Sequence, residues 1–164
     1  MFEVNGAASA AQVDYDSLAK QLNSLLGNER DFIANSAQFS AFIYQVLPEL
    51  NWAGFYLFDG QELVLGPFQG KVACVRIALG CGVCGAAAQQ RETIVVPDVH
   101  AFPGHIACDS ASRAEIVLPI VVEGRLLGVF DIDSPVHGRF NSEDALGLQA
   151  LLAIYVASTG FPKH

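Results

Sequence analysis

The sequence predicts an α+β domain in which an antiparallel sheet of about six strands is covered by N-terminal and C-terminal helices. Three observations support this fold class. Apolar residues recur at helical spacing near both ends of the chain. Short apolar runs separated by turn sequences fill its middle. The 164 residues, 52% hydrophobic and 16% charged, suffice for one domain with a hydrophobic core but not for two.

Helices are predicted at both ends of the chain. Residues 16–26 place leucines at helical spacing, and Gly27-Asn28 ends this helix. Residues 31–50 form a second helix with a broad apolar face and Pro48 near its end. The last helix begins at a capping sequence, Asn141-Ser142-Glu143-Asp144, and runs to about Ala157.

The strands lie between these helices. Two hairpins are predicted from apolar runs on either side of a turn, at Asp59-Gly60 and at Glu123-Gly124. A short helix rich in small residues interrupts the strands at 83–90, and residues 98–113 have no period. Long irregular segments of this kind are usually functional or disordered. The predicted strands are 52–58, 62–65, 72–79, 93–96, 114–122 and 125–133.

Composition excludes several functions. No linker or repeat divides the chain, so we expect residues 1–164 to form a single domain. A net charge of −8 opposes binding to nucleic acid. No signal peptide, membrane span or basic amphipathic stretch is present, so we expect a cytoplasmic protein with reduced thiols. Its four cysteines are therefore candidate metal ligands, redox groups or core residues.

Three acidic residues are predicted to meet on the last hairpin. Asp131 and Asp133 are two apart on one strand and project from the same face. A turn at Glu123-Gly124 pairs residues whose numbers sum to roughly 247, which places Glu115 beside both aspartates. Three carboxylates this close cannot all ionise cheaply, so at least one should hold a proton near neutrality. The alternative is a solvated strand end.

All four thiols lie between positions 74 and 108. Cys108, in the irregular segment after His105, is a better nucleophile candidate than a cysteine in a strand, because access governs thiol reactivity as much as pKa does. The alternative is that this thiol is inert, as isolated cysteines often are. Cys84 lies at the predicted start of a helix, where free amides lower a thiol pKa. Cys74 falls in an alternating strand pattern typical of a core residue.

A zinc site is the competing interpretation of these cysteines. Cys81 and Cys84 form a C-x-x-C, and His100, His105 and Cys108 could complete it, but no second pair follows at finger spacing. We therefore expect no resident metal. Nor does the chain carry a dinucleotide, Walker or nucleophile-elbow motif.

At these residues the chain resembles the free methionine-(R)-sulfoxide reductases, which are stand-alone GAF domains of about this length. The most specific signals are HIACD at 105–109, GVCG at 82–85 and DIDS at 131–134. The other matching segments are NWAGFY at 51–56, GPFQGKVAC at 66–74, PDVH at 97–100 and EIVLP at 115–119.

The resemblance implies a GAF-like fold and assigns roles to eight residues. Cys108 matches the catalytic thiol, and Cys74 and Cys84 match the cysteines that resolve and relay the oxidised state. An acidic substrate pocket is implied at Glu115, Asp131 and Asp133. Its apolar wall is implied at Trp52 and Tyr56, which by themselves could equally pack the core. Cys81 has no counterpart in the pattern.

The implied reaction reduces free L-methionine-(R)-sulfoxide to methionine through a cysteine sulfenic acid and an intramolecular disulfide. Thioredoxin would supply the electrons, with no cofactor. GAF domains often pair through their terminal helices, so the resemblance also admits a homodimer. Three alternatives rank below the reductase: first a non-catalytic GAF sensor, then a thiol redox switch, then a zinc-binding structural protein.

Overall fold

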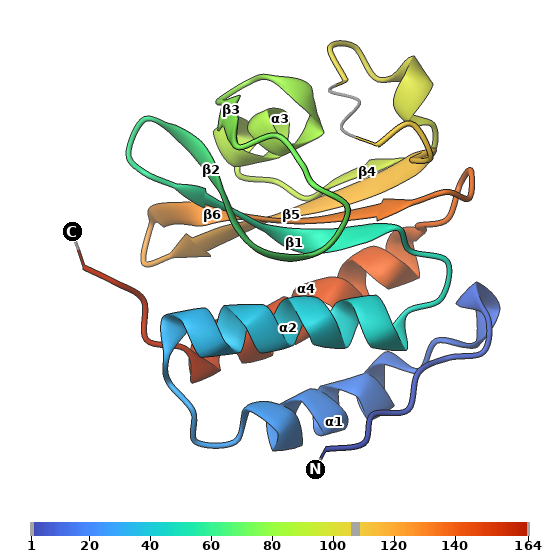
Figure 1. Ribbon diagram of the computed structural model, residues 1–164, viewed down its shortest axis with the longest axis vertical. Helices are drawn as coiled ribbons and strands as arrows, with labels where there is room; N and C mark the ends of the chain where they lie inside the picture. The colour runs from blue at the N-terminus through green and yellow to red at the C-terminus, as the bar shows by residue number, and fades with distance from the viewer. Residues whose placement is uncertain (1, 106–108, 164) are drawn as a thin grey trace.

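A computed structural model describes residues 2–105 and 109–163 of the chain (Figure 1). Its centre is a six-stranded antiparallel sheet in the order β3-β2-β1-β6-β5-β4. The strands are β1 (Trp52–Phe58), β2 (Glu62–Gly70), β3 (Arg76–Ala78), β4 (Ile94–Val96), β5 (Ala114–Val122) and β6 (Arg125–Ser134). The predicted α+β class, with an antiparallel sheet of about six strands, is therefore confirmed.

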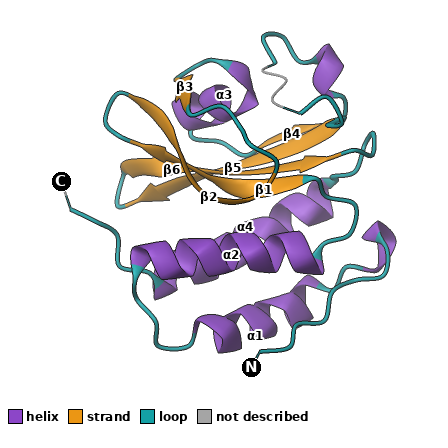
Figure 2. Ribbon diagram, viewed as in Figure 1, coloured by secondary structure: helices purple, strands orange, loops and turns teal. Residues whose placement is uncertain are grey.

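The helices lie in layers on both sides of this sheet (Figure 2). Helices α2 (Phe32–Val46) and α4 (Ser142–Ser158) cover one face, and α1 (Tyr15–Leu26) packs beneath them. Helix α3 (Gly82–Gln90) covers the opposite face. Two short 3-10 turns, Ala10–Gln12 and Val99–Ala101, complete the elements. Among the described residues, no helix is long and apolar enough to cross a bilayer.

Each face of the sheet has its own hydrophobic cluster. Phe55, Ile116 and Phe130 point toward the helices at the N- and C-terminal ends of the chain and pack with the leucines of α1 and α4. Val117 and Val129 point the other way and pack with α3. This alternation follows from the period-two geometry of strands. The α3 face therefore carries both an apolar cluster and polar side chains that line a cavity.

Three predicted boundaries were wrong. The strand predicted at 62–65 continues to Gly70. The helix predicted to end at residue 50 ends at Val46, because a residue before proline avoids the α conformation and Leu47 is extended. Glu49 follows with a φ of 64°. The strand predicted at 72–79 is only Arg76–Ala78. Residues 71–75 form a loop instead, with Val72 88% exposed.

The register of the last hairpin decides where the acids lie. Next to the turn, Val122 pairs with Arg125, so the paired numbers sum to 247 as predicted. A register shift between Ile120 and Val121 then raises the sum to 248. Glu115 consequently pairs with Asp133 rather than with position 132. Because a slip of one residue reverses every side chain, this irregularity puts Glu115 on the same face as the two aspartates.

Candidate active site

The acids form a row across two adjacent strands on the α3 face of the sheet. Glu115 on β5 pairs with Asp133 on β6, and Asp131 is the next β6 residue on that face. Glu115 and Asp131 are each only 5% exposed, whereas Asp133 is partly buried. We call these three residues the acid trio. The three carboxyls were predicted to lie close together, and the pairing of β5 with β6 brings them together on one face of the sheet.

Burial changes the protonation of the acid trio. Removal from water raises the pKa of Glu115 to about 8, and the negative charge of Asp133 adds to the effect. Burial first, and then the neighbouring carboxylates, raise the pKa of Asp131 and of Asp133 well above the usual range. The acid trio therefore holds protons at neutral pH and can donate one.

One cavity brings most of the predicted site residues together. The cavity and its mouth, which is open to solvent, together contain about 540 Å³ not filled by protein atoms. Its lining includes the acid trio, Cys84 at the third position of α3, and the two aromatic side chains on β1. Sequence spacing could not show that α3 carries Cys84 to the acid trio.

The predicted lowering of the Cys84 pKa was wrong. Cys84 does occupy the first turn of α3, but its side chain is buried and faces the acid trio. Burial and then the charges of Asp131, Glu115 and Asp133 raise its pKa well above the ordinary thiol value. These effects outweigh the helix N-terminus, so reduced Cys84 is a thiol rather than a thiolate.

Trp52 and Tyr56 both line the cavity and form an aromatic wall there. Their rings stack at 5.8 Å, and Phe68 of β2 stacks on Trp52 at 5.1 Å. Gly54 permits this arrangement, because a Cβ there would lie 2.2 Å from the Cβ of Phe68. Trp52 Nε1 donates a hydrogen bond to the Lys71 carbonyl at 3.0 Å. The wall is thus fixed from both sides.

The remaining thiols are placed differently from Cys84. Cys74 is partly buried in the loop before β3, and its carbonyl accepts a 2.9 Å hydrogen bond from the Tyr56 hydroxyl. Cys74 does not line the cavity, although Val72 and Ala73 do. Cys81, at the start of α3, is exposed and lies at the cavity edge. Cys108, the predicted nucleophile, lies outside the described residues.

The residues that flank the undescribed segment both line the cavity. His105 Nε2 lies 3.5 Å from Glu115 Oε1, and burial lowers the pKa of His105 below its usual value. Asp109 Oδ1 accepts a hydrogen bond from the Ala111 amide at 2.9 Å. Lys71 lies 3.9 Å from the same carboxylate. Asp109 thereby ties its own segment to the loop at residues 71–75.

No role was predicted for Asn51, which the structure places at this junction. Its Nδ2 donates to Asp109 Oδ2 at 3.1 Å and to Ser112 Oγ at 3.0 Å, and its amide N–H donates to the Asp133 carbonyl at 3.0 Å. Asn51 therefore links the segment around Asp109 to the acid trio. The only sequence feature that could have indicated a role for Asn51 is its position in the NWAGFY segment, which matches the reductase family.

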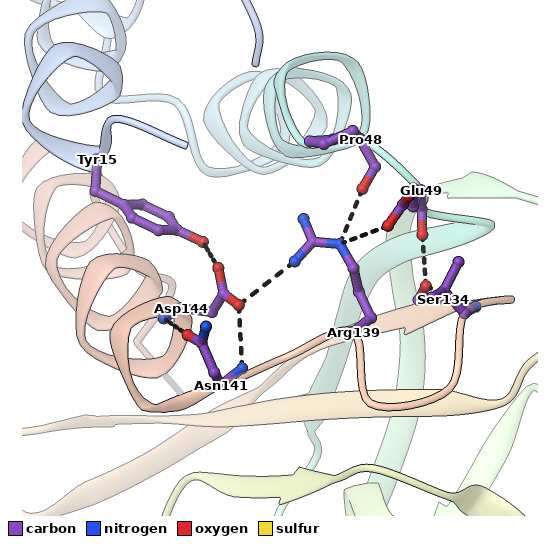
Figure 3. Close-up of polar contacts among 8 residues, drawn as sticks. Tyr15, Pro48, Glu49, Ser134, Arg139, Asn141 and Asp144 are labelled. Atoms are coloured by element: carbon purple, nitrogen blue, oxygen red, sulfur yellow. Dashed lines mark hydrogen bonds and ion pairs between the residues drawn. The ribbon is translucent and has the colours of Figure 1, made fainter. Parts of the chain in front are cut away.

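Behind this end of the sheet, a buried arginine holds the connection between α2 and β1 (Figure 3). Arg139 Nε donates to the Pro48 carbonyl at 3.1 Å, and its Nη1 lies 3.4 Å from Asp144 Oδ2. Ser134, directly after the acid trio on β6, donates to the Glu49 carbonyl at 2.6 Å. These contacts fix the backbone from which Asn51 and Trp52 extend.

The fold, with a cavity on the α3 face of its sheet, is that of a GAF domain, and the GAF domain family matches residues 17–159 of the chain. The free methionine-R-sulfoxide reductase of Escherichia coli strain K12 is 53% identical over 139 residues, which cover 85% of this chain and 84% of that protein. The enzyme of the same name from Saccharomyces cerevisiae is 41% identical over 154 residues, 89% of this chain and 86% of its own.

A solved structure agrees with these relatives. The free methionine-R-sulfoxide reductase of Neisseria meningitidis, in complex with its substrate, is 43% identical, with a TM-score of 0.85 over 96% of this chain and 98% of that chain. The chain therefore belongs to the free methionine-R-sulfoxide reductases of the GAF domain family.

Proposed function

We propose that this chain, an oxidoreductase of that family, reduces free L-methionine-(R)-sulfoxide through Cys108 and an intramolecular disulfide. The observation that carries the proposal is one cavity that joins a buried acid trio, a buried thiol and an aromatic wall. Family membership supports the substrate, because the named relatives are free methionine-R-sulfoxide reductases. The preference for the R sulfoxide rests on those relatives alone.

The acid trio suits the free amino group of the substrate. A free amino acid carries an ammonium group, whereas the same residue inside a polypeptide has a neutral amide at that nitrogen. Binding of the ammonium favours ionisation of the neighbouring carboxyls, since an opposite charge within a few ångströms lowers their pKa. The cavity is therefore expected to select the free amino acid, with the thioether chain against Trp52 and Tyr56.

The same carboxyls can supply the proton that the oxygen needs. Cys108 thiolate attacks the sulfoxide sulfur while a protonated carboxyl of the acid trio hydrogen-bonds to the oxygen. The sulfur–oxygen bond of the substrate and the transient sulfur–sulfur bond break as the protonated oxygen transfers to the Cys108 sulfur, so methionine leaves with its sulfur reduced and Cys108 becomes a sulfenic acid. Glu115, with its pKa near 8, is suited to this donation at neutral pH.

A second thiol completes the reaction. Attack of a neighbouring thiol on the sulfenic sulfur forms a disulfide and releases the oxygen as water. Cys84 is favoured for this step because its thiol lines the cavity. Cys74, in the loop held by Tyr56, would relay the disulfide outward. The dithiol of thioredoxin then restores both thiols by exchange, as expected in a reducing compartment such as the cytoplasm.

The test is turnover of free L-methionine-(R)-sulfoxide with a thioredoxin-recycling system, on the unchanged protein and on Cys108→Ser. Turnover that disappears in this variant supports the proposal, and Cys81→Ser is the matched control because Cys81 is exposed. Unchanged protein that binds the sulfoxide without turnover would favour a GAF sensor. A disulfide formed by peroxide without sulfoxide turnover would favour a redox switch. Activity retained in Cys108→Ser would refute the role of that thiol.

A further inference from the structure

Donor atoms of three different chemical kinds converge in the cavity. The thiol sulfur of Cys84 and one carboxylate oxygen each from Glu115 and Asp131 lie within 4.8 Å of one another, and all three residues are buried. An imidazole adjoins them, because His105 Nε2 is 3.5 Å from Glu115 Oε1. We call these four residues the donor cluster. They come from α3, β5, β6 and the segment before residue 106.

An unsatisfied oxygen indicates that the donor cluster lacks a partner. Asp131 Oδ1 is buried and has no hydrogen-bond partner among the residues that the structure describes. Asp131 also lines the cavity. A buried carboxylate oxygen without a donor is costly, and most such atoms in proteins are bonded to a protein group, a water or a ligand. Its position beside a thiol and a second carboxyl favours a cation.

We propose that the reduced, substrate-free protein binds one Zn²⁺ ion in this cavity through Cys84, Glu115 and Asp131, with His105 as the fourth ligand. Mixed sulfur, nitrogen and oxygen donors are typical of zinc, whereas Mg²⁺ and Ca²⁺ prefer oxygen alone. Tetrahedral zinc with bonds of about 2.0–2.3 Å places its ligand atoms about 3.5 Å apart. The donor cluster therefore needs to contract by about an ångström, which side-chain rotation can provide.

Protons compete with the metal at this site. Zinc binds the thiolate and the carboxylates, so Cys84 and Glu115 give up their protons when the ion binds. Burial and mutual repulsion raise the pKa of both groups. Asp109, from the loop, adds negative charge near the site.

This ion differs from the structural zinc considered from the sequence. The structural zinc site would have used the C-x-x-C cysteines with His100. In the structure His100 is exposed and does not line the cavity, and Cys81 is not part of the donor cluster. The consequence for turnover rests on the proposed function: zinc would occupy the place of the substrate ammonium and withhold Cys84, so it would inhibit in competition with the sulfoxide.

The test uses Co²⁺ as a spectroscopic probe of the reduced full-length chain. Titration should give one equivalent of bound Co²⁺ with a sulfur-to-cobalt charge-transfer band, strong visible bands of a tetrahedral ion, and loss of both on addition of Zn²⁺. Cys84→Ser should lose the charge-transfer band, and Asp131→Asn should weaken binding. Cys81→Ser, which alters a nearby exposed thiol, should bind as the unchanged protein does. Trp52 fluorescence would verify that each variant is folded.

The readout does not depend on catalysis. Absorption spectra report Co²⁺ binding whether or not the chain reduces any sulfoxide. The zinc proposal and the reductase proposal can therefore be tested separately. The zinc proposal is overturned if no stoichiometric Co²⁺ binding occurs at pH 8. It is equally overturned if the charge-transfer band persists in Cys84→Ser and disappears in Cys81→Ser. Displacement of Co²⁺ by free methionine sulfoxide would support the shared site.

Discussion

The buried carboxyl of Glu115 should make this protein lose stability as the pH rises. Burial raises the pKa of Glu115 from 4.5 to about 8, so the native state keeps a proton that the unfolded chain releases. The sign follows from linkage. The contribution to stability is complete below pH 4.5 and is lost as the pH rises through about 8. Glu115→Gln removes this titration, because a neutral amide of similar shape replaces the carboxyl.

The magnitude follows from the difference between the two pKa values. Each pKa unit corresponds to about 1.4 kcal/mol. The step from 4.5 to about 8 therefore corresponds to about 5 kcal/mol. This value is a ceiling, since water that enters the cavity on ionisation hydrates the charge. We expect Glu115→Gln to be within about 1 kcal/mol of the unchanged protein at pH 5 and more stable by up to about 5 kcal/mol at pH 9.

Urea unfolding measures this difference directly. Trp52 is the only tryptophan and is buried, so its fluorescence follows unfolding. Free energies of unfolding would be compared at pH 5, 7 and 9 under reducing conditions. Glu92→Gln, which removes an exposed charge in the turn after α3, is the control. A difference between Glu115→Gln and the unchanged protein that stays constant from pH 5 to pH 9 would refute the reasoning.

Two further variants test the support of the site. Arg139→Met removes the cation beside the buried Asp144, and we expect it to lower the free energy of unfolding by about 3 kcal/mol. Unaltered urea stability would contradict this. Gly54→Ala places a Cβ 2.2 Å from the Cβ of Phe68, so we expect a loss of about 1–3 kcal/mol and a changed native fluorescence spectrum of the stacked Trp52. A native spectrum identical to that of the unchanged protein would argue against this packing.

Much of the fold could be predicted from residue periodicity. Leucines at helical spacing and the capping sequence at Asn141 located α1 and α4 to within a residue or two. The strand prediction at 72–79 was wrong because the alternation of that segment is not a core pattern. Val72 and Val75 are exposed, and its backbone is held instead by Trp52 and Tyr56. Such long-range bonds leave no local signal.

The candidate site could be predicted only in part, for the same reason. Glu115 and the aspartates belong to one hairpin, so counting from its turn brought them together, although the register shift at Ile120 could not be foreseen. The approach of Cys84 from α3 depends on tertiary packing. Its protonation depends on that approach, which is why a local argument from the helix start gave the wrong direction for its pKa.

The most direct test of the central claim compares free L-methionine-(R)-sulfoxide with its N-acetyl derivative as substrates in the thioredoxin assay. The acid trio is proposed to bind the ammonium group that acetylation removes, and loss of one partner in a buried charge pair costs about 2–5 kcal/mol. We predict that kcat/KM falls by about 30-fold or more for the acetylated sulfoxide. Equal kcat/KM for the two sulfoxides would contradict the account, since the acid trio would then play no part in recognising a free amino acid.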